Sequence, residues 1–158
     1  MPRRIEYAKQ YEDFVQNLVR GDDTTGPFEN KARCLTYAAA FGASYGKNDG
    51  RLPLPAKSSE RAEPIRYDVF HSSGFEDLIC SLAVFATGDL KILENSETAA
   101  DRRITIFEEF ANRGLEKLKI ELTGETNLTE GLMLILKKQR TDASSKTDAI
   151  DWSKITSS

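Results

Sequence analysis

The chain has 158 residues, 39% of them hydrophobic and 30% charged, which suits one domain with a single core and a solvated surface. A net charge of -3 and a pI near 5.3 argue against binding nucleic acid through the overall field of the protein, although a local basic patch stays open. Charges interrupt every apolar stretch before a membrane span is complete, and no apolar secretory segment follows Arg3 and Arg4. Cys34 and Cys80 each sit in an apolar helical pattern, so we expect free thiols, a cytoplasmic location and no membrane partner.

Two helices are predicted first. Apolar residues recur at a helical period from Tyr7 to Val19, and Gly21-Asp22-Asp23 ends that run. The second helix is expected from about Phe28 to Tyr45, because aromatic residues recur at four-residue spacing and small residues lie round the rest of the cylinder. Such a helix is usually central in its bundle, and its small residues would let a neighbouring helix approach closely.

A polar segment separates these helices from the rest. Gly46 to Pro64 carries three prolines and several charges, is too polar to be buried, and is long enough that we expect it to have a purpose. The alternating pattern from Ile65 to Phe70 predicts a short strand or an extended docking segment.

The second half is predicted to be helical again. A third helix is expected to be capped by Ser72 or Ser73, with Glu76 as the capping-box partner of Ser73, and to end at Gly88; a turn at Leu90 to Leu93 follows. A fourth runs from Ala99 to Leu122, which Asn112-Arg113-Gly114 either divides in two or leaves whole. A last helix, capped by Asn127 or Thr129, passes through Leu132 to Leu136.

The fold class is therefore mainly α. We expect a compact single-domain helical bundle of about five helices over residues 1–140, with a long charged loop and at most a short strand. Residues 141–158 are polar and predicted to be a disordered tail, in which Trp152 is either a docking anchor or folded back on the domain. The small-residue face of the second helix packs within the chain or against a second copy, so a homo-oligomer stays open.

No motif in the chain predicts a catalytic residue, a metal site or a cofactor site. Gly42-Ala43-Ser44-Tyr45-Gly46-Lys47 has the wrong spacing for a phosphate loop and follows a helix, so Gly46 is better explained as a helix end. His71 could act with Asp68 or Asp77 as a general acid and base, but nothing supplies a nucleophile.

A metal-dependent nuclease is the weakest hypothesis. Acidic pairs occur at Asp22-Asp23, Glu76-Asp77 and Glu108-Glu109, and Glu29-Asn30-Lys31 has a nuclease-like Glu-x-Lys spacing. The Glu29 carboxylate is better explained by the dipole of the helix that starts there.

Arginines supply the candidate contact surface. Arg3-Arg4, Arg102-Arg103 and the run from Lys137 to Arg140 are each most simply solvated faces. If the long loop folds over the same side as Arg102 and Arg103, however, a phosphate-binding patch becomes available. The predicted partner or phosphate contacts are Arg51, Arg61, Arg66, Arg102, Arg103 and Trp152.

Two blocks of sequence carry a family resemblance. The first comprises Gly26-Pro27-Phe28, Ala38 to Gly42, Tyr45-Gly46, Arg51 to Pro55, Glu63-Pro64-Ile65 and Val69-Phe70; the second is Ile106 to Leu115. Together they resemble the DNA phosphorothioation (Dnd) system-associated protein 4 family over roughly residues 7–136. Phe110 stands where that family often has Tyr, and Arg113 where a small residue is common.

The resemblance implies a small accessory protein of bacterial DNA sulfur modification and its associated restriction, a phage-defence setting, and implies no reaction. Our leading hypothesis is a non-enzymatic adaptor without a cofactor that binds the modification or restriction proteins, with DNA as a further candidate ligand. The alternatives are a DNA-binding regulator or sensor of modified DNA, and an unrecognised metal-dependent nuclease.

Overall fold

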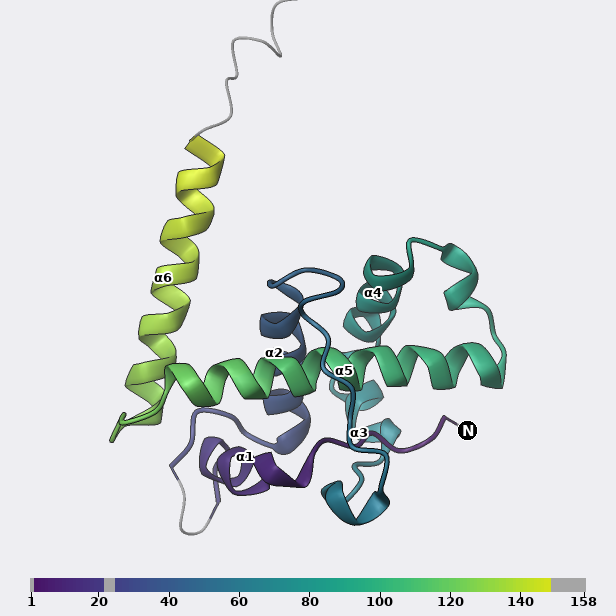
Figure 1. The fold of residues 1–158 in the computed structure, drawn as a ribbon, viewed down its shortest axis with the longest axis horizontal. Helices are drawn as coiled ribbons and strands as arrows, with labels where there is room; N and C mark the ends of the chain where they lie inside the picture. The colour runs from purple at the N-terminus through teal and green to yellow at the C-terminus, as the bar shows by residue number, and fades with distance from the viewer. Residues whose placement is uncertain (1, 22–24, 149–158) are drawn as a thin grey trace, which may run out of the picture. The chain divides into compact units, whose positions relative to one another are not determined.

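A computed structural model describes residues 2–21 and 25–148; for residues 143–148 it describes the backbone alone. These residues form six α-helices and three short 3-10 helices (Figure 1). In chain order they are η1 (Lys9–Tyr11), α1 (Glu12–Leu18), α2 (Lys31–Ala43), η2 (Ser58–Glu60), α3 (Tyr67–Ser72), α4 (Glu76–Thr87), η3 (Leu90–Leu93), α5 (Glu97–Glu121) and α6 (Leu128–Asp148). The mainly helical prediction is confirmed.

The chain forms two compact units, Met1–Ile120 and Glu121–Ser158. Within the described ranges, no helix is both long enough and apolar enough to cross a membrane.

The crossing of α2 and α5 organises the core of the first unit (Figure 1). A Cβ added at Gly114 of α5 would overlap the carbonyl oxygen of Ala38, and one added at Gly42 of α2 would overlap that of Phe110. The two backbones therefore touch, as the small residues of the second predicted helix indicated. Around this contact the apolar faces of both helices are buried, including Leu35, Phe107 and Leu115.

Helix α5 is continuous from Glu97 to Glu121 and does not break at Gly114. A glycine in a helix interior usually costs stability, by about 1 kcal/mol relative to alanine. Here its missing side chain is what permits α2 to pack, so the packing energy offsets that cost. The Asn-Arg-Gly sequence is a packing site and not a helix end.

The N-terminal segment is extended and paired, so the first helix begins later than its pattern suggested. Ile5 exchanges two backbone hydrogen bonds with Ile65, of 2.9 and 2.8 Å, and the Ala62 N–H donates to the carbonyl of Tyr7 at 2.9 Å. These are isolated antiparallel bridges and not a sheet. Ile5, Tyr7 and Ala8 are fully buried by this pairing.

The expected strand at residues 65–70 is wrong beyond its first residue. Ile65 makes the bridge to Ile5, and the chain then turns into α3. The helical turn buries Phe70 completely, with its ring edge-on to Phe107 at a centroid distance of 5.6 Å. A run of six residues carries too little periodicity to separate these alternatives, and burial of an aromatic ring decided between them.

The predicted capping box of α4 is also wrong. The N-cap position is Phe75, without a side-chain hydrogen bond, and Glu76 binds other partners. The predicted helix end at Gly88 is confirmed, because Gly88 is the C-cap of α4 and has a left-handed φ of 65°. Helix α2 ends at Ala43, earlier than predicted, and its C-cap is Ser44 and not Gly46. The turn at Leu90–Leu93 is η3.

The second unit contains α6. Asn127 caps it, because its Oδ1 accepts from the Glu130 N–H at 3.2 Å. Leu122 and Leu132 are buried, and the absent side chain of Gly131 leaves room for Leu122. The helix continues to Asp148, eight residues into the segment that we expected to be a disordered tail. Trp152 lies outside the described residues.

Candidate functional site

Two adjacent carboxylates of α5 hold distant segments of the first unit in place. Glu108 is 3% exposed, and Arg3 donates to both of its oxygens, at 2.6 and 3.1 Å. The Glu6 backbone N–H also donates to Glu108, at 2.6 Å. Burial raises the pKa of the Glu108 carboxyl, while these donors work in the opposite direction. Glu108 therefore fixes the N-terminal segment against α5.

Neighbouring groups on α5 hold the start of the long loop, in which Arg51, Leu52 and Leu54 are half-buried and Pro53 is exposed, in agreement with the expectation that this loop is too polar to be buried. Glu109 pairs with Arg51 at 3.3 Å, and its backbone carbonyl accepts from the Leu52 N–H at 3.0 Å. Asn112, 1% exposed, donates to the carbonyls of Leu52 and Pro53. The loop satisfies its backbone polar groups on α5, which is why it can lie flat against a helix.

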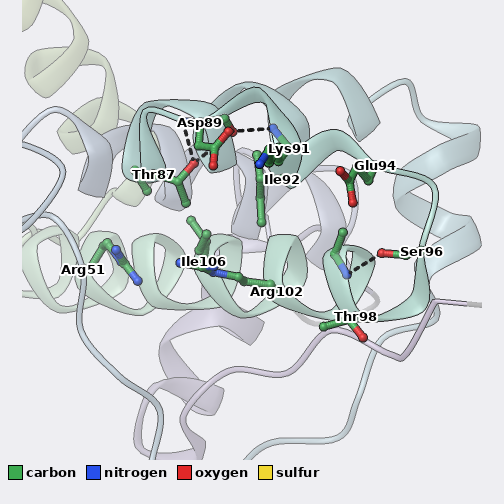
Figure 2. A pocket seen from close by; sticks show the side chains of 12 residues that line it. Arg51, Thr87, Asp89, Lys91, Ile92, Glu94, Ser96, Thr98, Arg102 and Ile106 are labelled. Carbon is green, nitrogen blue, oxygen red and sulfur yellow. Dashed lines mark hydrogen bonds between the residues drawn. The ribbon is translucent and has the colours of Figure 1, made fainter.

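This attachment forms a pocket of about 640 Å³ on the first unit (Figure 2). Arg51 enters from the loop, Thr87 and Asp89 from the end of α4, Lys91 and Ile92 from η3, and Thr98 and Arg102 from the first turns of α5. Ala86, Ala99 and Ile106 supply its apolar lining. Figure 2 shows the Arg102 side chain extending along α5 in the direction of Arg51. We call this the Arg51–Arg102 pocket.

Its charges are mixed, with a small cationic excess. Arg102 makes no hydrogen bond or ion pair with the described part of the chain, and the Nε of Arg51 is buried without a partner there. The charged lining residues are Arg51, Lys91 and Arg102, together with Asp89 and Glu94. The Asp89 carboxylate is engaged as the cap of η3, since it accepts from the Lys91 N–H at 3.0 Å. The pocket suits an anionic group on a small ligand or side chain better than an extended polyanion.

The other predicted contact residues lie elsewhere. Arg61 pairs with Glu6 at 2.7 Å and donates to the Pro55 carbonyl, which ties the far end of the loop to the N-terminal segment. Arg103 donates to the carbonyl of Ile92 at 2.7 Å and so anchors η3. Arg66, at the start of α3, pairs with Asp68 at 2.6 Å in an exposed position. Of the predicted contact residues that the structure describes, Arg51 and Arg102 are the two that line one pocket.

His71, which the sequence suggested as a general acid or base, is paired with a carboxylate. His71 Nδ1 lies 2.5 Å from Glu76 Oε2, and the Tyr67 hydroxyl donates to the other Glu76 oxygen at 3.1 Å. The hydrogen bond with His71 lowers the pKa of Glu76, and burial raises that of Tyr67 to about 12. His71 thus pairs with Glu76 and not with Asp68 or Asp77 as expected. Among the described residues, no three His, Cys, Asp or Glu side chains gather as a metal site would require.

Sequence reasoning missed three residues that build this site: Arg3, Asn112 and Gly114. One signal was available. Glu108 falls on the apolar stripe of its helix, and a carboxylate on a buried face needs a cationic partner. The identity of that partner, over one hundred positions away in the sequence, was not predictable from spacing.

The fold and the pocket together define a small helical domain with one long spine helix and a surface pocket of mixed charge. The chain belongs to the DNA sulphur modification system-associated protein 4 family, whose model matches residues 4–155. This confirms the resemblance carried by the two sequence blocks. No curated protein and no solved structure matches the chain. The family description associates the protein with a DNA sulphur modification system.

Proposed function

We propose that this protein is a non-enzymatic accessory protein of a bacterial DNA phosphorothioation-linked modification and restriction system. It acts in the cytoplasm as an adaptor in phage defence, and it binds a protein of that system through the Arg51–Arg102 pocket. Membership of the family supports the association with DNA sulphur modification, and the pocket is the surface that we propose for binding the partner protein.

The roles of the carboxylates support an adaptor over a nuclease. Glu108 and Glu109 hold Arg3 and Arg51, and Glu29 pairs with Arg33 one turn along, at 3.3 Å. A nuclease needs carboxylates free to bind a metal ion and water. Asp22 and Asp23 lie outside the described residues.

The observation that carries the proposed contact is Arg102. It is an exposed guanidinium without a partner in the described structure, beside a second guanidinium and an apolar lining. Arginine beside apolar surface is typical of residues that dominate protein interfaces, because the planar guanidinium binds a carboxylate with two hydrogen bonds. We expect the partner to insert an acidic side chain flanked by apolar residues.

Duplex DNA is the competing ligand for the same pocket. The net charge of -3 and the carboxylates of Asp89 and Glu94 at the pocket oppose a phosphate backbone. An Arg102-dependent shift of plain or sulfur-modified duplex at low salt would replace the adaptor proposal with a DNA-binding regulator or sensor.

The test is a pull-down of the modification and restriction proteins with the native chain, Arg102→Glu and Lys47→Glu. Lys47 is exposed, lies outside the pocket and undergoes the same charge change. We expect Arg102→Glu to lose at least tenfold in affinity and Lys47→Glu to bind like the native chain. Equal binding by all three proteins would remove the pocket from the proposal.

A further inference from the structure

Helix α6 carries an apolar face that the described structure leaves uncovered. Met133 is 51% exposed, Leu134 is 60% exposed and Leu136 is 40% exposed. The opposite side of the same helix is less exposed: Leu132 is buried, and Leu128 and Ile135 are half-buried. Contiguous exposed apolar side chains on a helix are typical of an interaction surface.

The charges on that face are arranged symmetrically. At 3.6 residues per turn, Glu130, Met133, Leu134 and Lys137 fall within an arc of about 100°. Glu130 lies one turn before the two apolar residues, and Lys137 lies one turn after them. Neither charged side chain forms an ion pair within the described part of the chain. Along the helix, this face therefore carries an acidic residue, two apolar residues and then a basic residue.

This order is self-complementary in one orientation only. If two copies of α6 lie antiparallel and centred between Met133 and Leu134, each Glu130 faces the Lys137 of the other copy. Met133 of each copy then packs on Leu134 of the other. A parallel pair would place Glu130 against Glu130 and Lys137 against Lys137, and like charges in register are destabilising.

We propose that α6 is a homodimerisation helix, which pairs antiparallel with α6 of a second copy of this chain about a two-fold axis. The interface is isologous, so each ion pair occurs twice. It covers about two turns of α6 per copy, with Met133 and Leu134 at its centre, which predicts a weak dimer that assembles at micromolar or higher concentration. The surface shares no residue with the Arg51–Arg102 pocket, so the two proposals are tested by different substitutions.

The test is a charge-swap series on the full chain, measured by sedimentation equilibrium at low salt from micromolar to submillimolar concentration. Glu130→Lys and Lys137→Glu should each raise the dimer dissociation constant at least about tenfold, because attraction becomes repulsion at both symmetric sites. An equal mixture of the two variants should form a heterodimer at least as tight as the native dimer, and the double variant should recover native dimerisation.

Two controls separate the interface from general effects of charge and folding. Lys138→Glu makes the same charge change about 100° further round the helix and should leave the dimer intact. Leu134→Asp should abolish dimerisation with native helical content by circular dichroism, since Leu134 is exposed. A native chain that is monomeric at all these concentrations would overturn the proposal. So would a mixture that fails to pair, or an effect of Lys138→Glu equal to that of Lys137→Glu.

Discussion

The two halves of α5 use their side chains in opposite ways. From Phe107 to Leu118 nearly every residue is committed to the fold: apolar side chains fill the core, Glu108 and Asn112 hold other segments, and Gly114 admits α2. From Glu97 to Ile106 the helix has one buried edge and an open side that lines the Arg51–Arg102 pocket. Charged residues occur in both halves, so charge alone does not mark a contact surface.

The difference lies in whether each charge has a partner. Glu108 is satisfied and buried, and its removal would leave the Arg3 guanidinium and the Glu6 N–H without their acceptor. Arg102 is exposed, and no group in the described part of the chain relies on it for a hydrogen bond or ion pair. The following substitutions test this contrast in order of expected effect.

Gly114→Ala should be the most destabilising. The new Cβ would overlap backbone atoms of Ala38, which cannot move without separating α2 from α5. We expect a loss of about 3 kcal/mol or more in the free energy of unfolding, measured with urea. Gly131→Ala is the matched control, because its nearest neighbour is the end of the flexible Leu122 side chain. If both variants lose the same stability, the backbone contact is not what holds the helices together.

Glu108→Gln should cost about 2 kcal/mol at neutral pH, because the charge-assisted bonds from Arg3 are lost and the new amide group is itself a donor. The pH dependence has a definite sign. Burial raises the pKa of Glu108 above its unfolded value of about 4.3, so the cost of Glu108→Gln has a pH-dependent part that is fully present below that value. This part alone is lost as the pH rises through the folded-state pKa, and the cost expected at neutral pH is what remains.

Urea titrations at pH values from about 4 upward should therefore show the advantage of the native chain over Glu108→Gln shrinking as the pH rises. A constant difference across this range would mean that Glu108 does not titrate with a raised pKa in the folded protein.

Asn112→Ala should cost about 1 kcal/mol and act locally. It removes the donor for the carbonyls of Leu52 and Pro53 while leaving the Leu52 N–H bond to Glu109. Hydrogen exchange should rise across residues 50–56 and stay native in α2. Uniform acceleration over both segments would show that the loop and the core unfold together.

Arg102→Ala should have the smallest effect on stability, within about 0.5 kcal/mol of the native chain. Arg103→Ala is its neighbour and control: it releases the carbonyls of Ile92 and Glu94 and should cost about 1 kcal/mol. Thermal unfolding distinguishes the two. If Arg102→Ala loses more stability than Arg103→Ala, then Arg102 is the structural residue and the contact role assigned to it is wrong.

Much of the helical architecture could be predicted from the sequence. The apolar period of α5, the small residues of α2 and the helix end at Gly88 were predictable because each depends on residues close in the chain. The wrong predictions came from short or ambiguous segments. Residues 65–70 alternate like a strand, and Ser73 with Glu76 has capping-box spacing. In the first place a distant partner, Phe107 for Phe70, outweighed the local preference. In the second, Glu76 binds His71 and Tyr67, five and nine residues before it, and does not cap the helix.

The candidate site shows the same division. The sequence nominated several arginines without ranking them, because an exposed cation and a paired one have identical local patterns. Folding paired Arg61 and Arg66, turned Arg103 toward η3 and left Arg102 beside Arg51.

By itself, the sequence determined the helical class, the family and the periodic faces, since these depend on residue type and near-neighbour spacing. Only the tertiary structure decided which charges are structural. That depends on where Arg3 and the long loop meet α5, and contacts between residues so far apart in the chain are set by the packing of the whole unit.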